Sequence, residues 1–259
     1  MTSPQLTFEP GAAVIAGGSG GIGASTARLF GASGVPVVLT YHSNKAAADA
    51  VAGTIGAAGG DCEVLRCDLT VPEEVEDVLA QARARYDRVG HVVYAAGPSF
   101  AFNFIGAIPD SEWHRVLAAD VNGCFHLTQS AVRTFRNQGG GNLVAVTTAA
   151  VGRTAPGDVL SAAPKSAIET LIRGVAKEAG RFGVRANCVG PGWIDAGLGE
   201  RALRDQLDER QRDKIRAEVI PLRRFGAAEE VGFAVLYLCS QQAGFITGQS
   251  LAVDGGAQL

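Results

Sequence analysis

The sequence predicts an α/β protein in which helices cover both faces of a parallel sheet. Short apolar runs alternate with longer amphipathic segments along the whole chain, and this alternation is typical of a parallel sheet with right-handed crossovers. Several apolar runs show no polar alternation, which indicates strands buried on both faces. Apolar side chains make up 47% of the 259 residues, enough for a substantial core.

Seven runs are predicted as strands and six longer segments as helices. The strands are expected at 12–16, 37–40, 62–66, 91–95, 143–147, 185–189 and 250–253. The helices are expected at 22–33, 44–58, 72–86, 111–137, 160–180 and 228–240. Because no linker or internal repeat interrupts this order, we expect one domain over residues 1–259. The charged segment 195–220 is either a solvated surface helix or a lid beside the substrate.

Composition argues against several classes of function. The 23 basic and 26 acidic side chains give a net charge of −3, without the basic excess of a nucleic-acid-binding protein. Residues 89–108 carry no Asp, Glu, Lys or Arg, but glycine, proline and polar residues interrupt them, so we expect no membrane span. The five scattered cysteines form no C-x-x-C pair, which argues against disulfides and a metal site. Since no signal-peptide pattern opens the chain, we expect a cytoplasmic protein.

A glycine-rich turn follows the first predicted strand and opens the first predicted helix. Its sequence is A-G-G-S-G-G-I-G over residues 16–23. Glycine lets the backbone turn sharply and approach a pyrophosphate, whose charge is stabilised at the helix N-terminus. A plain tight turn is the alternative. The strand–turn–helix setting favours a Rossmann-type, doubly wound sheet with a dinucleotide site at this turn.

The spacing of Gly17, Gly21 and Gly23 resembles the T-G-x-x-x-G-x-G signature of the short-chain dehydrogenase/reductase family, with Ala16 in place of the Thr. The resemblance covers essentially the whole chain and is nearest to the 3-oxoacyl-carrier-protein reductases. It is carried further by C-D-L-T (67–70), Y-A-A-G (94–97), V-N-G (121–123), P-G-W-I-D-A-G (191–197) and a tail containing T-G-Q and D-G-G.

The resemblance implies a nicotinamide dinucleotide, with Asp68 at the adenine ring and the segment from Pro191 over the nicotinamide. From the resemblance and from the residue chemistry described next, we expect the coenzyme to contact Gly17, Ser19, Gly21, Ile22, Gly23, Tyr41, His42, Ser43, Lys45, Asp68, Leu69, Ala96, Gly97, Lys165, Pro191, Gly192 and Ile194.

The end of the second predicted strand bears on the choice of coenzyme. A carboxylate at this place would bind the ribose diol and repel a 2′-phosphate. The sequence instead has Y-H-S-N-K over 41–45, in which Ser43 is a donor and His42 and Lys45 are potential cations for a phosphate. NADP(H) is therefore favoured over NAD(H). A Lys45 that only begins the next helix in solvent is the alternative.

The catalytic pattern departs from the family. The family places a Ser thirteen residues before a Tyr and a Lys four residues after that Tyr, and counting back from Lys165 gives Ser161 at the Tyr position and Thr148 at the Ser position. Asn122 corresponds to the family's helix-bending asparagine. An aliphatic hydroxyl is a far weaker acid than a phenol, and the oxygen of Ser161 ends roughly 4 Å nearer its backbone. We expect Asn122, Thr148, Ser161 and Lys165 to form the catalytic centre, with Lys165 passing a proton through water.

Two other groups are candidates for the missing acid. Tyr94 ends the fourth predicted strand at the edge where ligands bind, although packing in the core is the alternative that we favour. Asp158 precedes Ser161 by three residues, and a solvated loop residue is the alternative there. Phe100, Phe102 and Phe104 follow the fourth strand; together with Trp193 they either line a pocket for an apolar or aromatic carbonyl substrate or belong to the core or an interface.

Three functions compete at this stage. The first is an NADP(H)-dependent oxidoreductase that interconverts a ketone and a secondary alcohol with an atypical proton donor. The second is a catalytically silent dinucleotide-binding subunit, and the third is a non-redox cyclase, dehydratase or isomerase on the same fold. The retained glycines and Lys165 favour the first two. The family resemblance also implies a homo-tetramer or dimer paired through the helices at 111–137 and 160–180 and by contacts near the C-terminus.

Overall fold

A computed structural model describes residues 5–197 and 205–259. Its seven strands form one parallel sheet in the order β3-β2-β1-β4-β5-β6-β7. The strands are β1 (Ala12–Ala16), β2 (Val37–Tyr41), β3 (Cys62–Arg66), β4 (Val89–Tyr94), β5 (Gly141–Val146), β6 (Val184–Pro191) and β7 (Ser250–Val253). Each predicted strand is present within a few residues of its predicted bounds, and the doubly wound α/β fold is confirmed.

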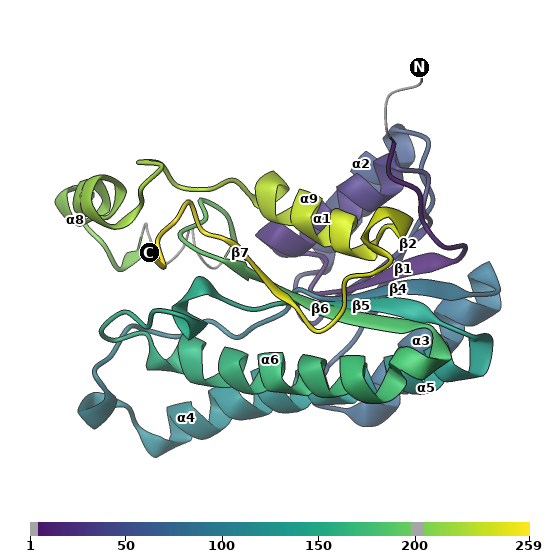
Figure 1. Cartoon of the computed structure of the whole chain (residues 1–259), viewed down its shortest axis with the longest axis horizontal. Helices are drawn as coiled ribbons and strands as arrows, with labels where there is room; N and C mark the ends of the chain where they lie inside the picture. The colour runs from purple at the N-terminus through teal and green to yellow at the C-terminus, as the bar shows by residue number, and fades with distance from the viewer. Residues whose placement is uncertain (1–4, 198–204) are drawn as a thin grey trace.

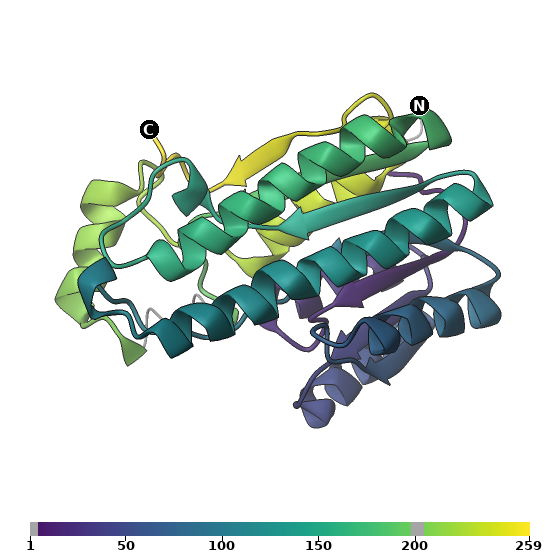
Figure 2. The ribbon, with the colours of Figure 1, turned by 90° about the horizontal axis from the view of Figure 1, so that it is seen from below.

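Helices cover both faces of this sheet (Figure 1). One face carries α1 (Gly21–Ala32), α2 (Lys45–Ala57) and α9 (Ala228–Cys239), and the other carries α3 (Pro72–Tyr86), α5 (Gly123–Gln138) and α6 (Val159–Ala179). Figure 2, seen from below, shows α3, α5 and α6 lying across the strands. Two further α-helices are α4 (Asp110–Leu117) and α8 (Glu209–Lys214). Single 3₁₀ turns are η1 (Ile105–Ala107), η3 (Ala149–Val151), η4 (Gly180–Phe182) and η6 (Gln241–Ala243).

The core consists of two apolar layers, one on each side of the sheet. Along β1, Ala12, Val14 and Ala16 pack toward α3, α5 and α6, whereas Ala13 and Ile15 pack toward α1, α2 and α9. This follows from the strand geometry, because successive side chains point to opposite faces. A strand covered on both sides needs apolar residues at every position, which explains why the polar alternation is missing.

The β1–β4 pair marks the place where the strand order reverses. From β1 the chain builds outward through β2 and β3, and it then returns to add β4 on the other side of β1. Connections leave the two strands in opposite directions, so a crevice opens at their carboxyl ends. The glycine turn after β1 and the Y-A-A-G segment at the end of β4 both lie at this point.

The predicted helix 111–137 is not one regular helix. Between α4 and α5 the chain forms a π-helical segment, η2 (Ala118–Asn122), so the predicted helical stretch is present but changes its type of helix in the middle. A π segment accommodates one residue more than the α-helical spacing allows, and such segments are frequent at functional sites. The interruption falls at Asn122, where the resemblance implied a bend.

The predicted lid, 195–220, falls partly outside the described residues. Its described part contains α8, which begins with a capping box in which Asp208 and Gln211 bond each other's backbone N–H groups. A π-helical segment, η5 (Ile215–Val219), follows directly. The role of a lid stays a prediction. Within residues 5–197 and 205–259, no helix combines the length and apolar character needed to cross a bilayer.

Candidate active site at the carboxyl edge of the sheet

The glycine turn of residues 17–23 is held between β2 and β4. Gly17 has a φ of +80°, and a Cβ there would lie 2.8 Å from the carbonyl oxygen of Ala95. At Gly23 a Cβ would meet the carbonyl oxygen of Gly17 at 2.3 Å. The amide of Gly18 donates to the carbonyl of Thr40 over 3.0 Å, which ties the turn to β2. The protein's own packing therefore requires glycine at positions 17 and 23.

The N-terminus of α1 offers free backbone donors at this turn. No acceptor among the described residues is found for the N–H groups of Gly21 and Ile22, which are two of the donors that a helix start leaves unpaired. Ser19 and Gly20 lie just before them in the turn. Unpaired N–H groups together with the helix dipole stabilise an anion. A cradle closed to side chains and lined by these donors fits the pyrophosphate of a dinucleotide.

The segment after β6 approaches the same turn. The backbone of Gly197 lies so close to Gly21 that a Cβ on Gly21 would come within 2.5 Å of the Gly197 nitrogen. Pro191 ends β6, Gly192 packs on Asp254, and Ile194 is buried and bridges to Gly226. These contacts bring the predicted coenzyme residues of the P-G segment to the crevice, beside the glycine turn. Gly21 and residues 195–197 also line a hollow of about 560 Å³.

The residues predicted at the adenosine end lie at the carboxyl end of β2 and β3. Tyr41 ends β2, and Lys45 begins α2, where its ammonium pairs with Asp49 at 2.8 Å. His42 and Ser43 are exposed on the connection between these two elements. The His42 ring lies 3.4 Å from an oxygen of Asp68.

Asp68 is fixed by the chain that follows it. Thr70 donates to Asp68 from both its amide and its hydroxyl, and these hydrogen bonds hold the pKa of the Asp68 carboxyl below its usual value. The carbonyl of Leu69 lies 2.9 Å from the His126 ring on α5. Asp68 and Leu69 are thus brought to the same edge of the sheet as the glycine turn.

A buried ion pair lies at the other end of the crevice. The Lys165 ammonium on α6 is 2.7 Å from Asp120 in η2, and their side chains are 11% and 3% exposed. Lys165 also donates to the carbonyl of Ala96 over 3.3 Å, next to Gly97. The Tyr94 hydroxyl donates to the same Asp120 oxygen over 2.6 Å. The Lys165 nitrogen lies 4.9 Å from the centre of the Tyr94 ring.

This pairing decides between the two interpretations of Tyr94. Its side chain is fully buried, and burial together with the Asp120 charge raises the pKa of the phenol well above its usual value. Tyr94 is therefore a core residue that holds Asp120, as the favoured alternative had it. Sequence reasoning missed Asp120. Its only signal was an acidic side chain two residues before Asn122 in the mainly apolar stretch A-A-D-V-N-G.

The remaining predicted catalytic residues lie on η2, on α6 and just after β5. Asn122 is exposed at the end of η2, Ser161 lies one turn before Lys165 on α6, and Thr148 follows β5. The Thr148 oxygen accepts a hydrogen bond from the amide of Ala150 over 3.2 Å, which leaves its own hydrogen free to donate. A Cβ on Gly190 of β6 would lie 3.4 Å from Thr148.

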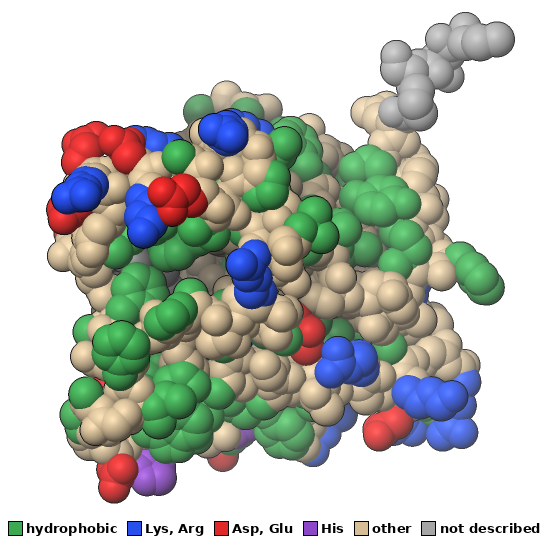
Figure 3. All heavy atoms as spheres, turned by 60° about the vertical axis from the view of Figure 1, so that its left-hand side comes forward, with side chains coloured by type: hydrophobic (Ala, Val, Ile, Leu, Met, Phe, Trp, Pro, Cys, Tyr) green, Lys and Arg blue, Asp and Glu red, His purple; other side chains and the backbone are tan. Residues whose placement is uncertain are grey.

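Aromatic side chains lie on the segments that follow β4 and β6. The Phe100 and Phe102 rings are 6.2 Å apart, and Trp193 lies 6.5 Å from Phe102. Phe104 is 75% exposed and joins no aromatic pair within the described ranges. In Figure 3, which turns this side of the molecule forward, hydrophobic side chains gather at the lower left, and charges of both signs gather at the upper left and the lower right. Phe100, Phe102 and Trp193 thus form a row of neighbouring rings, which we call the aromatic wall.

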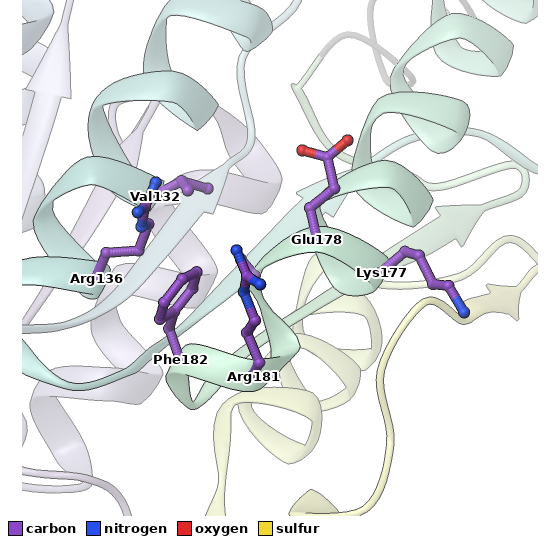
Figure 4. A pocket seen from close by; sticks show the side chains of 7 residues that line it. Val132, Arg136, Lys177, Glu178, Arg181 and Phe182 are labelled. Atoms are coloured by element: carbon purple, nitrogen blue, oxygen red, sulfur yellow. The ribbon is translucent and has the colours of Figure 1, made fainter.

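A second hollow, of about 420 Å³, lies away from the crevice, where α5 and α6 end (Figure 4). Arg136 and Arg181 both lie over the Phe182 ring, at 4.5 and 4.7 Å. In the described residues there is no group of three or more His, Cys, Asp or Glu side chains suited to a metal ion.

Comparisons with known proteins agree with this geometry. A family model described as enoyl-(acyl carrier protein) reductase matches residues 16–258. The uncharacterized oxidoreductase YgfF of Escherichia coli is 33% identical over 252 residues, which are 94% of this chain and 98% of that protein. The chain belongs to the short-chain dehydrogenase/reductase family. It is thus related to oxidoreductases over nearly its whole length.

Further short-chain dehydrogenase/reductase proteins resemble this member closely. The 3-oxoacyl-[acyl-carrier-protein] reductase FabG of Escherichia coli is 31% identical over 98% of this chain and 100% of its own. A short-chain type dehydrogenase/reductase of Mycobacterium ulcerans superposes with a TM-score of 0.90 at 28% identity, covering 98% of this chain and 91% of that one. A 7α-hydroxysteroid dehydrogenase, solved with NADH and 7-oxo glycochenodeoxycholic acid, has a TM-score of 0.89 at 28% identity and covers 99% and 97% of the two chains.

Proposed function

We infer that this chain is an NADP(H)-dependent oxidoreductase that interconverts a ketone and a secondary alcohol with an atypical proton donor. The observation that carries the inference is the glycine cradle at the N-terminus of α1, at the same sheet edge as the Lys165 ammonium. The coenzyme supplies or accepts the hydride when it is bound. The free N–H groups of Gly21 and Ile22 hold its pyrophosphate, and the Lys165 ammonium holds the nicotinamide ribose.

The reacting oxygen is bound by the hydroxyl of Thr148. Because Thr148 already accepts from Ala150, its hydrogen is directed to another acceptor, and a carbonyl oxygen is the acceptor that the reaction offers. Asn122 at the end of η2 and Ser161 on α6 hold water between this oxygen and Lys165. Ser161 stands in for the family's Tyr, so the proton reaches the substrate by a route other than a phenol.

Preference for NADP(H) is supported by the absence of a carboxylate in the sequence Y-H-S-N-K at the end of β2. Ser43 and His42 bind the 2′-phosphate, and Lys45 adds positive charge even while it pairs with Asp49. Asp68 accepts from the adenine amino group. The wall of Phe100, Phe102 and Trp193 favours an apolar or aromatic carbonyl substrate, as does the steroid in the related dehydrogenase.

We also propose that the protein acts in the cytoplasm as a homo-tetramer or dimer. All five cysteines are free thiols, which suits a reducing compartment. Assembly is supported by exposed apolar side chains on and near α9 and β7, namely Phe233, Tyr237, Phe245 and Leu251.

Calorimetry with all four nicotinamide dinucleotides tests the proposal, followed by NADPH oxidation with a panel of apolar and aromatic ketones. We expect binding of NADPH and NADP⁺ that is tighter than that of NADH and NAD⁺, and NADPH oxidation with at least one ketone. Binding without oxidation of NADPH would instead favour a silent dinucleotide-binding subunit. Conversion of a substrate at unchanged NADPH absorbance would favour a non-redox enzyme, and absence of binding heat with every dinucleotide would refute coenzyme binding.

A further inference from the structure

The first turn of α6 carries three polar groups along one line. The carbonyl of Asp158 accepts from the amides of Ser161 and Ala162, each over 3.0 Å, so Asp158 is the N-cap residue of this helix. Ser161 follows it by three residues and Lys165 by seven. Residues at such intervals lie on one face of a helix. This face therefore presents a carboxyl, a hydroxyl and an ammonium in that order at the carboxyl edge of the sheet.

Asp158 does not use its carboxyl as N-cap residues usually do. An Asp at this position commonly accepts from the second or third amide of the helix, as Asp208 does at the start of α8. The side chain of Asp158 makes no such bond, and no donor or cation within the described residues contacts its oxygens. The carboxyl is thus free to act on something outside the helix.

The surroundings of Asp158 favour the protonated form of its carboxyl. Burial raises the pKa of this carboxyl to about 7, and burial is the only cause of the shift. The preceding Gly157 is bonded through its carbonyl to the amide of Asn103, and a Cβ on it would lie 3.7 Å from Phe102. The loop before α6 is therefore packed against the aromatic wall of the crevice.

Charged groups on the neighbouring elements are engaged elsewhere. Arg153 of the same loop donates to the carbonyl of Ala257, and Lys165 of α6 pairs with Asp120. Asp195, after β6, is exposed, and the segment 98–104 has no titratable side chain. None of these groups shifts the pKa of Asp158, so its carboxyl titrates with the single pKa that its burial gives.

We propose that Asp158 is the proton donor for carbonyl reduction, acting on the substrate oxygen directly or through the Ser161 hydroxyl. This rests on the proposed function. Hydride passes from NADPH to the carbonyl carbon, the carbon–oxygen π pair moves to oxygen, and that oxygen takes the proton from the Asp158 carboxyl. The products are the secondary alcohol, NADP⁺ and the Asp158 carboxylate, which regains a proton from solvent. Tyr94 does not serve because its hydroxyl is bonded to Asp120 inside the core.

The test compares Asp158→Asn with a matched Asp77→Asn control on the exposed face of α3. NADPH oxidation with an active ketone is followed from pH 5 to 9 in both variants and in the wild type. The wild-type rate should fall as the pH rises through about 7, because the acid form is consumed. The kcat of Asp158→Asn should be roughly 10²- to 10⁴-fold lower. Its rate should no longer fall through this pH range, so the descending limb of the pH profile should be absent. Its NADPH affinity, measured by calorimetry, should be unchanged. The Asp77→Asn control should keep both the rate and the limb.

A second readout does not depend on activity. A carboxyl whose pKa is higher in the folded chain than in the unfolded one costs stability as the pH rises from 3.8 toward about 7. Asp158→Asn removes this cost, so its melting temperature relative to wild type should rise between pH 4 and pH 8. Infrared spectra at pH 6 should show a protonated-carboxyl band that Asp158→Asn lacks and Asp77→Asn keeps.

Outcomes separate this proposal from the proposed function. A wild-type rate and pH limb in Asp158→Asn would overturn the role of Asp158 alone, as would an infrared band that the variant retains. A wild type that binds NADPH but reduces no ketone would overturn the proposed redox function and the proposal that rests on it. Ser161→Tyr in the Asp158→Asn background supplies a phenol at the family position, and recovery of the rate there would show that only the acid was missing.

Discussion

The two ends of the crevice differ in the groups that form them, which are main-chain groups at one end and charged side chains at the other. The glycine turn after β1 is made of backbone, because its geometry leaves no room for a Cβ at Gly17 or Gly23 and its donors are main-chain N–H groups. The end near α6 is made of side-chain charge, with Lys165 and Asp120 paired in the interior and Tyr94 bonded to the same carboxylate. Added side-chain atoms should therefore disrupt the glycine turn, whereas the loss of either charged partner should disrupt the end near α6.

This difference determines which substitutions each end can accept. At Gly17 and Gly23 a side chain would collide with neighbouring backbone, so these two positions are restricted to glycine. At the other end, the ammonium needs an anion and the reaction needs an acid, and more than one residue can meet either need. On α6, Ser161 lies one turn after Asp158 and one turn before Lys165, which pairs with Asp120.

The largest expected effect is that of Lys165→Ala. It leaves the Asp120 carboxylate buried without its cation, and breaking such a pair costs about 3–5 kcal/mol of unfolding free energy. Coenzyme affinity should fall as well. Urea denaturation and calorimetry measure the two effects. Lys177→Ala, on the same helix but exposed, should stay within about 0.5 kcal/mol of wild type; an equal loss in both variants would contradict the charged character of this end.

The next effect is that of Gly17→Ala at the backbone end. The added Cβ meets the Ala95 carbonyl in a left-handed conformation, and these two costs together are on the order of 3 kcal/mol. Gly174→Ala is the matched control inside α6, where a Cβ meets nothing within 4 Å. That change should stabilise the protein by about 0.5–1 kcal/mol. Thermal unfolding of both variants decides the matter, and a stable Gly17→Ala that binds NADPH would remove the backbone argument.

Tyr94→Phe should have a smaller effect. It deletes the hydroxyl that donates to Asp120 and keeps the ring under the Lys165 ammonium. Loss of one donor to a buried carboxylate costs about 1.5–3 kcal/mol, with no change in the pH limb of the reaction. A pH profile altered by Tyr94→Phe would instead make the phenol part of the proton route, contrary to its burial.

Lys45→Ala should have the smallest effect, because this residue is exposed at the start of α2. We expect unchanged stability and a loss of NADPH affinity of about 1.5 kcal/mol, or roughly tenfold, with NADH affinity unaltered. Asp49→Ala, which frees the ammonium, should leave NADPH binding intact or improve it. Equal losses for both coenzymes in Lys45→Ala would contradict a 2′-phosphate contact.

Local patterns predicted the strands and the glycine turn, because each depends on neighbours in sequence, whereas the bend near Asn122 was expected only from the family resemblance. The pairing of Lys165 with Asp120 was not predicted, since it joins residues 45 positions apart through tertiary packing. The same holds for Tyr94, whose partner lies 26 positions away. Asp158 was recognised as a candidate from its distance to Ser161, but only the packed loop reveals its burial.

The π-helical segment fixes how α4 and α5 are phased. It holds one residue more than an α-helix of the same length would, at the junction that contains Asp120 and Asn122. Deleting Val121 would restore regular α-helical spacing, and everything before the deletion would then rotate by about 100° around the helix axis. The apolar side of α4 would rotate away from α6, and Asp120 would no longer point toward Lys165. Deleting a single residue here would therefore change the direction in which the side chains of α4 point.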